Sequence, residues 1–146
     1  MNAVTIDPRL LDDCHLLGQL ASGAVLLNRN AALHWFILVP NTTLGDILDL
    51  PVAERDAVIA DCAALSAFLK RALGYRKTNF AGLGNVVAQM HLHIIGRNAG
   101  DVCWPQPVWG NLPAVQAGDG HHTTEQLLDM QSQLAANLGL VPAALA

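Results

Sequence analysis

The sequence is poor in charge, in basic residues and in long apolar runs. Charged residues make up 14% of the 146 residues and hydrophobic residues 52%, whereas an average soluble domain is about 25% charged. The 8 basic residues against 12 acidic ones give a net charge of −4, so no basic excess exists to neutralise a nucleic-acid backbone. The densest apolar stretch, residues 31–40, is short and interrupted by His34, far from the roughly 18 residues of a membrane span. We therefore expect neither nucleic acid nor a membrane as a partner.

Cysteine is also scarce. Cys14, Cys62 and Cys103 are odd in number, widely spaced and free of any C-x-x-C pair, which excludes a disulfide framework or a zinc knuckle built from them alone. We expect reduced, mostly buried thiols. The first ten residues contain Asp7 and Pro8 and lack a basic region followed by an apolar stretch, so they do not resemble a secretory signal. These features predict a cytoplasmic protein.

The chain, 1–146, is predicted to form one domain of two hairpins and two helices. Alternation and turn residues predict strands at 23–28 and 33–39, and again at 76–81 and 87–95. Apolar residues at three- and four-residue steps predict a long helix over 51–73, including Val58, Ile59, Cys62, Leu65, Leu69 and Leu73. A last helix is predicted from Glu125 to about Leu138, with Thr123 or Thr124 as its cap. This order predicts an α+β fold with a largely antiparallel sheet.

The segment 87–95 holds the most informative residues. As a strand, it places Gln89, His91, His93 and Ile95 on one face and the apolar Met90, Leu92 and Ile94 on the other. The two histidines have three interpretations: polar filler on an exposed face, a metal pair, or catalysis by imidazole, which is a competent nucleophile at neutral pH. A further pair, His121 and His122, is predicted to be exposed polar sequence.

The sequence from Gln89 to Arg97, Gln-Met-His-Leu-His-Ile-Ile-Gly-Arg, resembles the signature of the histidine-triad superfamily of nucleotide hydrolases and transferases, in which three histidines alternate along one strand. The strand 77–81 with its asparagine, the strand over 33–40 ending in Val-Pro, and the Trp104-Pro105 pair agree with that family, so the resemblance covers about residues 20–110. It implies a mostly antiparallel five-stranded sheet with the long helix packed on it, and a homodimer.

The resemblance also implies roles for individual residues. His91 holds the middle position, whose imidazole attacks the α-phosphorus of a nucleotide derivative to form a nucleotidyl-histidine that water then hydrolyses. His93 holds the third position, where its N–H binds a phosphate oxygen or assists the departing group. The bond cleaved is a phosphate anhydride or a phosphoramidate next to a nucleoside. The expected substrate-binding residues are Asn28, Asn79, Asn85 and Trp104. Two interpretations stay open for Trp104 and Trp109, which lie among prolines: they either anchor the core or cover a nucleotide site.

Gln89 stands where the triad has its first histidine. An amide can orient an imidazole or bind a phosphate oxygen, but it cannot shuttle a proton. One alternative follows from this residue: a nucleotide-binding or sensing protein without turnover. A second alternative, which Gln89 disfavours because a three-histidine cluster is absent, is a metal-dependent hydrolase that uses His91 and His93 with a carboxylate such as Asp101. The favoured mechanism requires no cofactor and no metal ligands, and it leaves room for a divalent cation that accompanies the substrate phosphates.

Overall fold

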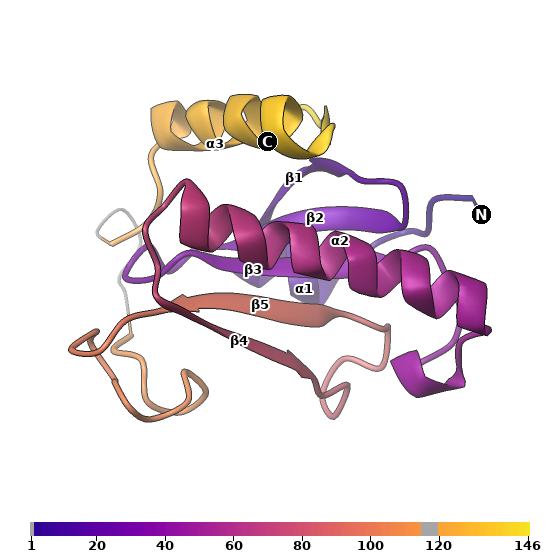
Figure 1. Cartoon of the computed structure of the whole chain (residues 1–146), viewed down its shortest axis with the longest axis horizontal. Coiled ribbons are helices and arrows are strands. Elements are labelled where there is room, and N and C mark those ends of the chain that lie inside the picture. The colour runs from indigo at the N-terminus through magenta and orange to yellow at the C-terminus, as the bar shows by residue number, and fades with distance from the viewer. Residues whose placement is uncertain (1, 115–119) are drawn as a thin grey trace.

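The computed structural model describes residues 2–114 and 120–146. Its centre is a six-stranded antiparallel sheet with the strand order β4-β5-β3-β2-β1-β6 (Figure 1). The strands are β1 (Cys14–Gln19), β2 (Gly23–Asn28), β3 (Trp35–Pro40), β4 (Lys77–Gly82), β5 (Leu92–Arg97) and β6 (Val141–Pro142). The helices are α1 (Pro8–Asp13), α2 (Val52–Arg71) and α3 (Thr124–Leu138), with a 3₁₀ turn, η1 (Ile47–Asp49). The predicted α+β class is confirmed.

Both predicted hairpins are present, and the sheet has one strand more than the expected five. The sequence analysis missed β1 and β6 at one edge. The period-two pattern of β1 is broken by a register shift between Leu16 and Gly18, and β6 is only two residues long. A side chain at Gly18 would collide with the main-chain oxygen of Val141, so the glycine permits these two strands to approach each other.

The strand that carries the histidines is shorter than predicted. It begins at Leu92 rather than at residue 87. Leu92 pairs with Leu38 of β3 on one side and, on the other, with Gly82, where β4 ends. Before that point the chain turns through Gly84, whose φ of +71° suits glycine. His91 therefore lies one residue outside the sheet, at the mouth of the β4–β5 hairpin.

The two predicted helices, α2 and α3, begin and end near their predicted limits, whereas α1 was not predicted. α2 starts after Pro51, and the turn beyond it contains Gly74 with a φ of +77°. α3 has a capping box in which Thr123 and Gln126 bond each other's backbone N–H groups. Ile59, predicted to be in the apolar stripe of α2, is 41% exposed, because it lies beside the sheet edge formed by β4. In the described part of the chain, no helix is long and apolar enough to cross a membrane.

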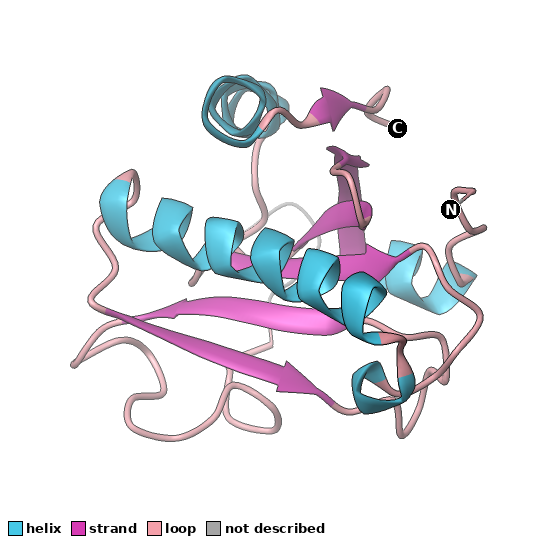
Figure 2. Cartoon of the chain, turned by 45° about the vertical axis from the view of Figure 1, so that its right-hand side comes forward, coloured by secondary structure: helices cyan, strands magenta, loops and turns pink. Residues whose placement is uncertain are grey.

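The sheet separates two apolar cores. α2 and α3 cover one face, where Leu65 and Leu134 belong to the same core as the strand residues Leu92 and Ile94. Figures 1 and 2 show α2 lying along the sheet and α3 beyond its β1 edge. The other face is covered by α1 and by part of the segment 98–112, with a core that includes Leu10, Trp35, Ile37, Ile95 and Val108. This second face contains the histidines of the signature.

Candidate active site

The alternation predicted for residues 89–95 holds within β5 and just before it. Met90, Leu92 and Ile94 are buried in the core beneath α2, whereas Ile95 is buried in the core of the opposite face. His93, which pairs with Ile37 of β3, is 5% exposed on that opposite face. The rings of His91 and His93 are in edge contact, with centroids 5.0 Å apart. The structure therefore brings the two predicted catalytic histidines together.

The tautomer of His91 follows from its neighbour. The Nδ1 atom lies 2.7 Å from the main-chain oxygen of Gln89. A carbonyl oxygen only accepts hydrogen bonds, so Nδ1 must carry the ring proton. In the neutral imidazole this leaves the lone pair on Nε2. The backbone of residue 89, and not its side chain, therefore orients His91 for nucleophilic attack.

His93 has the opposite tautomer to His91. The indole Nε1–H of Trp35 donates to Nδ1 of His93 at 3.0 Å, so Nδ1 is an acceptor and the proton of the neutral ring is on Nε2. Burial, and then the neighbouring His91 ring, lower the pKa of His93 to about 4. At neutral pH His93 is thus an uncharged N–H donor, suited to binding an oxygen and poor as a general acid.

A cavity of about 650 Å³ opens over these two histidines, within the size range of small-molecule sites. Two predicted substrate-binding residues, Asn28 and Asn85, line it together with Arg9, Trp35 and Trp109. The Trp109 ring stands edge-on to His93 at 5.0 Å. A second hollow of about 310 Å³ shares His91 with the first. The proposed nucleophile therefore faces open space on a largely apolar surface with a few polar groups.

The Gln89 side chain does not enter this cavity. Its Oε1 accepts the main-chain N–H of Asp7 at 2.8 Å, and its Nε2 donates to the main-chain oxygen of Thr5 at 2.8 Å. The residue at the first triad position therefore binds the N-terminal segment. Sequence analysis placed Gln89 on the strand face with the histidines, but its side chain pairs with backbone more than 80 residues away in sequence.

Asn79 and Trp104, also predicted to bind substrate, lie outside the cavity lining. The Oδ1 of Asn79 accepts from the guanidinium of Arg97 at 2.9 Å, and the ring of Trp104 lies 5.5 Å from the Arg97 Cζ. Arg97 also forms a buried ion pair with Asp101 at 2.8 Å, with side chains 2% and 6% exposed. These contacts hold the segment after β5, and that segment leads to Trp109.

Asp101 is the carboxylate that the metal-dependent alternative needed near His91 and His93. It lies instead beyond the far end of β5, bound to Arg97, which chiefly by its hydrogen bonds keeps the pKa of Asp101 below its usual value. Among residues 2–114 and 120–146, no three His, Cys, Asp or Glu side chains are arranged to hold a metal ion.

His121 and His122 are not exposed as predicted; both are half-buried. His122 packs beside His34 and His15, with ring centroids 5.7 Å and 6.5 Å away. Burial, with His34 and His15 nearby, lowers the pKa of His122 to about 4. The main chain of His121 bridges to Asn30, which brings this distant segment onto the sheet end. The cluster is separate from the cavity over His91.

The three cysteines are free and buried, as predicted. Burial, aided by a neighbouring aspartate in each case, raises the pKa of Cys14 and of Cys62 to about 12. Both thiols are therefore protonated and unreactive at neutral pH. Cys14 lines the cavity but is no candidate nucleophile.

The sequence analysis missed three residues that shape the site: Arg9, Trp35 and Trp109. Trp35 received no role from the sequence, and Trp109 was a candidate for either the core or the site. No local pattern marks Arg9, because it reaches the cavity through the packing of α1 against the 83–91 loop. These residues are recognised only by contacts between segments that lie far apart in the sequence.

Comparison with known proteins agrees with this geometry. The profile of the HIT domain matches residues 12–100. A histidine triad protein of Marinobacter aquaeolei is 35% identical, with a TM-score of 0.83 over 94% of this chain and 98% of its own. A histidine triad protein of Bradyrhizobium japonicum is 31% identical, with a TM-score of 0.83 over 94% and 99%. A histidine triad (HIT) protein of Sinorhizobium meliloti is 31% identical, with a TM-score of 0.82 over 92% and 96%. No curated protein matches.

Proposed function

The chain belongs to the HIT domain family, and from this premise we propose that it is a nucleotide hydrolase or transferase that acts through a nucleotidyl-histidine on His91. The observation that carries the proposal is the tautomer of His91: its Nδ1 proton is held by the Gln89 carbonyl, which leaves the Nε2 lone pair for attack at the mouth of a cavity of nucleotide size.

The reaction has two steps. In the first, Nε2 of His91 attacks the α-phosphorus, the P–N bond forms, and the bond to the leaving group breaks with its electron pair. In the second, water attacks the same phosphorus and releases the nucleoside monophosphate and the free imidazole. His93 contributes the Nε2–H of its neutral ring, which binds a non-bridging oxygen as charge develops on it. The bond cleaved is a phosphate anhydride or a phosphoramidate.

The nucleoside end of the substrate is proposed to lie among Trp109, Trp35 and Asn28, which line the cavity on the side of β2 and β3. The aromatic rings offer apolar surface to a base, and the Asn28 amide is a hydrogen-bond partner for a ribose. Asn85 lies in the 83–91 loop beside His91, where it is a candidate for a phosphate contact. Asn79 and Trp104 act on this site only through the Arg97 cluster.

A second candidate is a nucleotide-binding protein without turnover. Two observations favour it: the Gln89 amide is bonded through both its oxygen and its nitrogen to the N-terminal backbone, and the neutral His93 is a poor acid. Neither group supplies a proton to a leaving group that needs one. A cytoplasmic location remains a prediction based on the free cysteines.

The function is tested with the wild type and His91→Ala, incubated with diadenosine tetraphosphate or adenosine phosphoramidate, with and without a chelator. We expect AMP release by the wild type that persists with chelator and falls at least a thousandfold in His91→Ala, because the nucleophile is lost. Mass spectrometry of a wild-type reaction quenched with denaturant at alkaline pH, where the P–N bond survives, should detect a nucleotide adduct on the peptide that contains residue 91.

His121→Ala is the matched control, since it removes a histidine outside the cavity and should retain activity. Bound nucleotide without AMP release from either substrate would favour the binding protein. Activity that chelator abolishes would favour metal-dependent hydrolysis.

A further inference from the structure

The N-terminal segment, residues 5–13, is bound to the loop that presents His91. Gln89 holds the backbone of this segment at two points, Thr5 and Asp7, each at 2.8 Å. The guanidinium of Arg9 adds a third link, from Nη1 to the main-chain oxygen of Val86 at 3.1 Å. The HIT domain profile begins at residue 12, so most of this segment is an addition to the part of the chain that the profile matches.

Arg9 is oriented by its own element. Asp7 accepts from Nε of Arg9 at 3.2 Å and from Nη2 at 2.9 Å, a two-point contact between carboxylate and guanidinium. With the bond to Val86, three of the five N–H donors of the side chain are used. One N–H on each terminal nitrogen remains for a ligand, at the end of a side chain that is 59% exposed.

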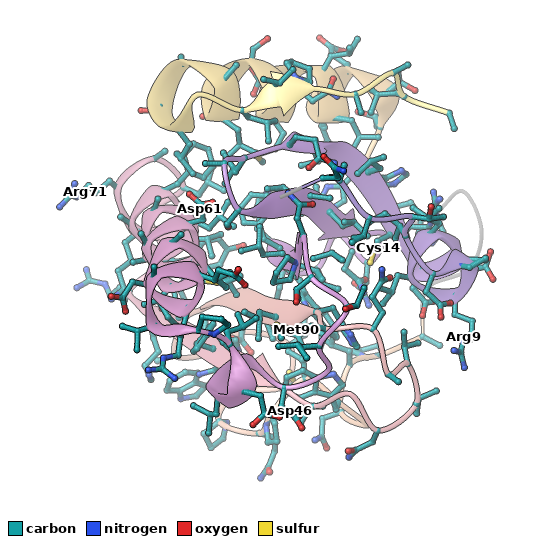
Figure 3. All side chains as sticks on the ribbon, turned by 90° about the vertical axis from the view of Figure 1, so that its right-hand side faces the viewer. Arg9, Cys14, Asp46, Asp61, Arg71 and Met90 are labelled. Carbon is teal, nitrogen blue, oxygen red and sulfur yellow. The ribbon has the colours of Figure 1, made fainter. Side chains whose placement is uncertain are left out.

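The position of Arg9 relates it to the proposed nucleophile. Arg9 lines the same cavity as His91 and is the one positively charged side chain among the described residues of that lining. The pKa of its partner Asp7 is lowered, chiefly by the hydrogen bonds with Arg9. His91 is close enough to Asp7 to make a smaller contribution in the same direction. Figure 3 shows Arg9 at the outer edge of the molecule, beneath α1 and opposite Arg71 of α2.

Two groups beside His91 lack the chemistry to neutralise a leaving group. The Gln89 amide is engaged by backbone and has no acidic proton, and His93 is uncharged at neutral pH. A leaving group that departs as a phosphate therefore carries its negative charge away from phosphorus unprotonated. A fixed guanidinium stabilises such a charge without a proton transfer, because its fork matches two phosphate oxygens.

We propose that residues 5–13 form part of the substrate site, with Arg9 as the residue that binds the phosphate chain beyond the reacting phosphorus and Gln89 as the positioning residue that holds this segment in place. The proposal rests on the proposed function, because it assumes a nucleotide in the cavity over His91. It assigns to the first triad position a task in substrate recognition, performed through another residue.

The test measures binding and not turnover. Isothermal titration calorimetry gives the affinities of AMP and of adenosine α,β-methylene triphosphate, an analogue with a carbon in place of the bridging oxygen next to the α-phosphorus. We expect the wild type to bind the analogue more tightly than AMP. Arg9→Gln should reduce this ratio of affinities about tenfold, the order of one or two hydrogen bonds to a charged group at an exposed position.

Arg71→Gln is the matched control. It removes the same charge from an exposed position on α2, across the molecule from Arg9 (Figure 3), and should leave the ratio unchanged. Arg9→Lys keeps the charge but lacks the two-point geometry of the guanidinium. We expect it to lower the ratio of affinities less than Arg9→Gln does. Circular dichroism of each variant checks that the chain is folded.

The role of Gln89 is tested by Gln89→Leu, which removes both bonds to the N-terminal backbone. We expect it to lower the same ratio of affinities, and the double variant with Arg9→Gln to be no worse than Arg9→Gln alone, because a residue that acts through Arg9 has no further effect once Arg9 is gone. A merely structural role for Gln89 would instead lower the affinities for AMP and for the analogue equally.

The outcomes separate the two proposals. An unchanged ratio in Arg9→Gln, with normal AMP release by the wild type, would overturn the role of Arg9 and leave the nucleotidyl-histidine mechanism intact. A reduced ratio in a chain that never releases AMP would support Arg9 and refute the catalytic proposal. A wild type that binds neither AMP nor the analogue would overturn both.

Discussion

At the scale of the residue, two hydrogen bonds decide the chemistry of the site. One directs the Nδ1 proton of His91 to the Gln89 carbonyl, and the other gives Nδ1 of His93 a donor in Trp35. The second bond is testable because phenylalanine keeps most of the Trp35 ring and removes its N–H. We expect Trp35→Phe to lower kcat about fivefold, the order of one neutral hydrogen bond of about 1 kcal/mol.

The ¹⁵N chemical shifts of the imidazoles check whether the loss of kcat comes from the tautomer of His93. In the wild type at pH 7, His93 should show a protonated Nε2 and an unprotonated Nδ1, and Trp35→Phe should give a mixture of tautomers. Trp109→Phe is the control, because Trp109 contacts His93 through its ring edge. A wild-type His93 that is protonated on Nδ1 would contradict this account.

At the scale of the element, the segment 98–112 takes its position from a buried ion pair. Arg97 and Asp101 are 2% and 6% exposed, and Arg97 also donates to the main-chain oxygen of Gln106 at 2.8 Å. Asp101→Asn would leave the guanidinium buried without its counter-charge. We expect the free energy of unfolding at pH 7 to fall by about 3 kcal/mol or more, measured by urea denaturation.

The same pair predicts a pH dependence. The folded state holds the pKa of Asp101 below its unfolded value, so its contribution is complete above about pH 4 and is lost as the pH falls through the lower, folded pKa. Asp101→Asn should lose this part of the acid dependence. Asp129→Asn, on the exposed face of α3, is the control and should change stability by less than about 0.5 kcal/mol. Equal losses in the two variants would refute the role of Asp101.

At the scale of the whole molecule, the sheet has an edge, β4, that no strand covers in the described chain. Beside it a shallow apolar groove of about 220 Å³ runs between β4 and α2, where Phe80 is 51% exposed and Ile59 41%. Exposed strand edges with apolar side chains favour pairing with another chain. Together with the low charge content, this supports our proposal that a second copy of the chain covers this edge in a homodimer.

Light scattering at micromolar concentration should therefore give the mass of a dimer for the wild type and of a monomer for Phe80→Glu, because a buried carboxylate without a partner opposes association. Val141→Glu is the control: it places the same charge on an exposed residue at the opposite edge of the sheet and should remain dimeric. A monomeric wild type would refute the proposal.

Features that depend on neighbours along the chain could be predicted from the sequence. Alternation located the hairpins and placed Met90, Leu92 and Ile94 on the face opposite the histidines. The three- and four-residue apolar steps located α2, and Thr123 marked the start of α3. These patterns are readable because a helix or a strand repeats its geometry every few residues. The signature at 89–97 likewise identified the family, which the profile match confirms.

The details of the site depend instead on how distant segments pack together. β5 begins at Leu92, opposite the last residue of β4. Gln89 turns to backbone 82 and 84 residues away, and Trp109 reaches His93 because Arg97 and Asp101 hold its segment. Arg9 joins the cavity for the same kind of reason. Such contacts leave no periodic trace in the sequence, since a side chain's partner is set by how whole elements pack around the core.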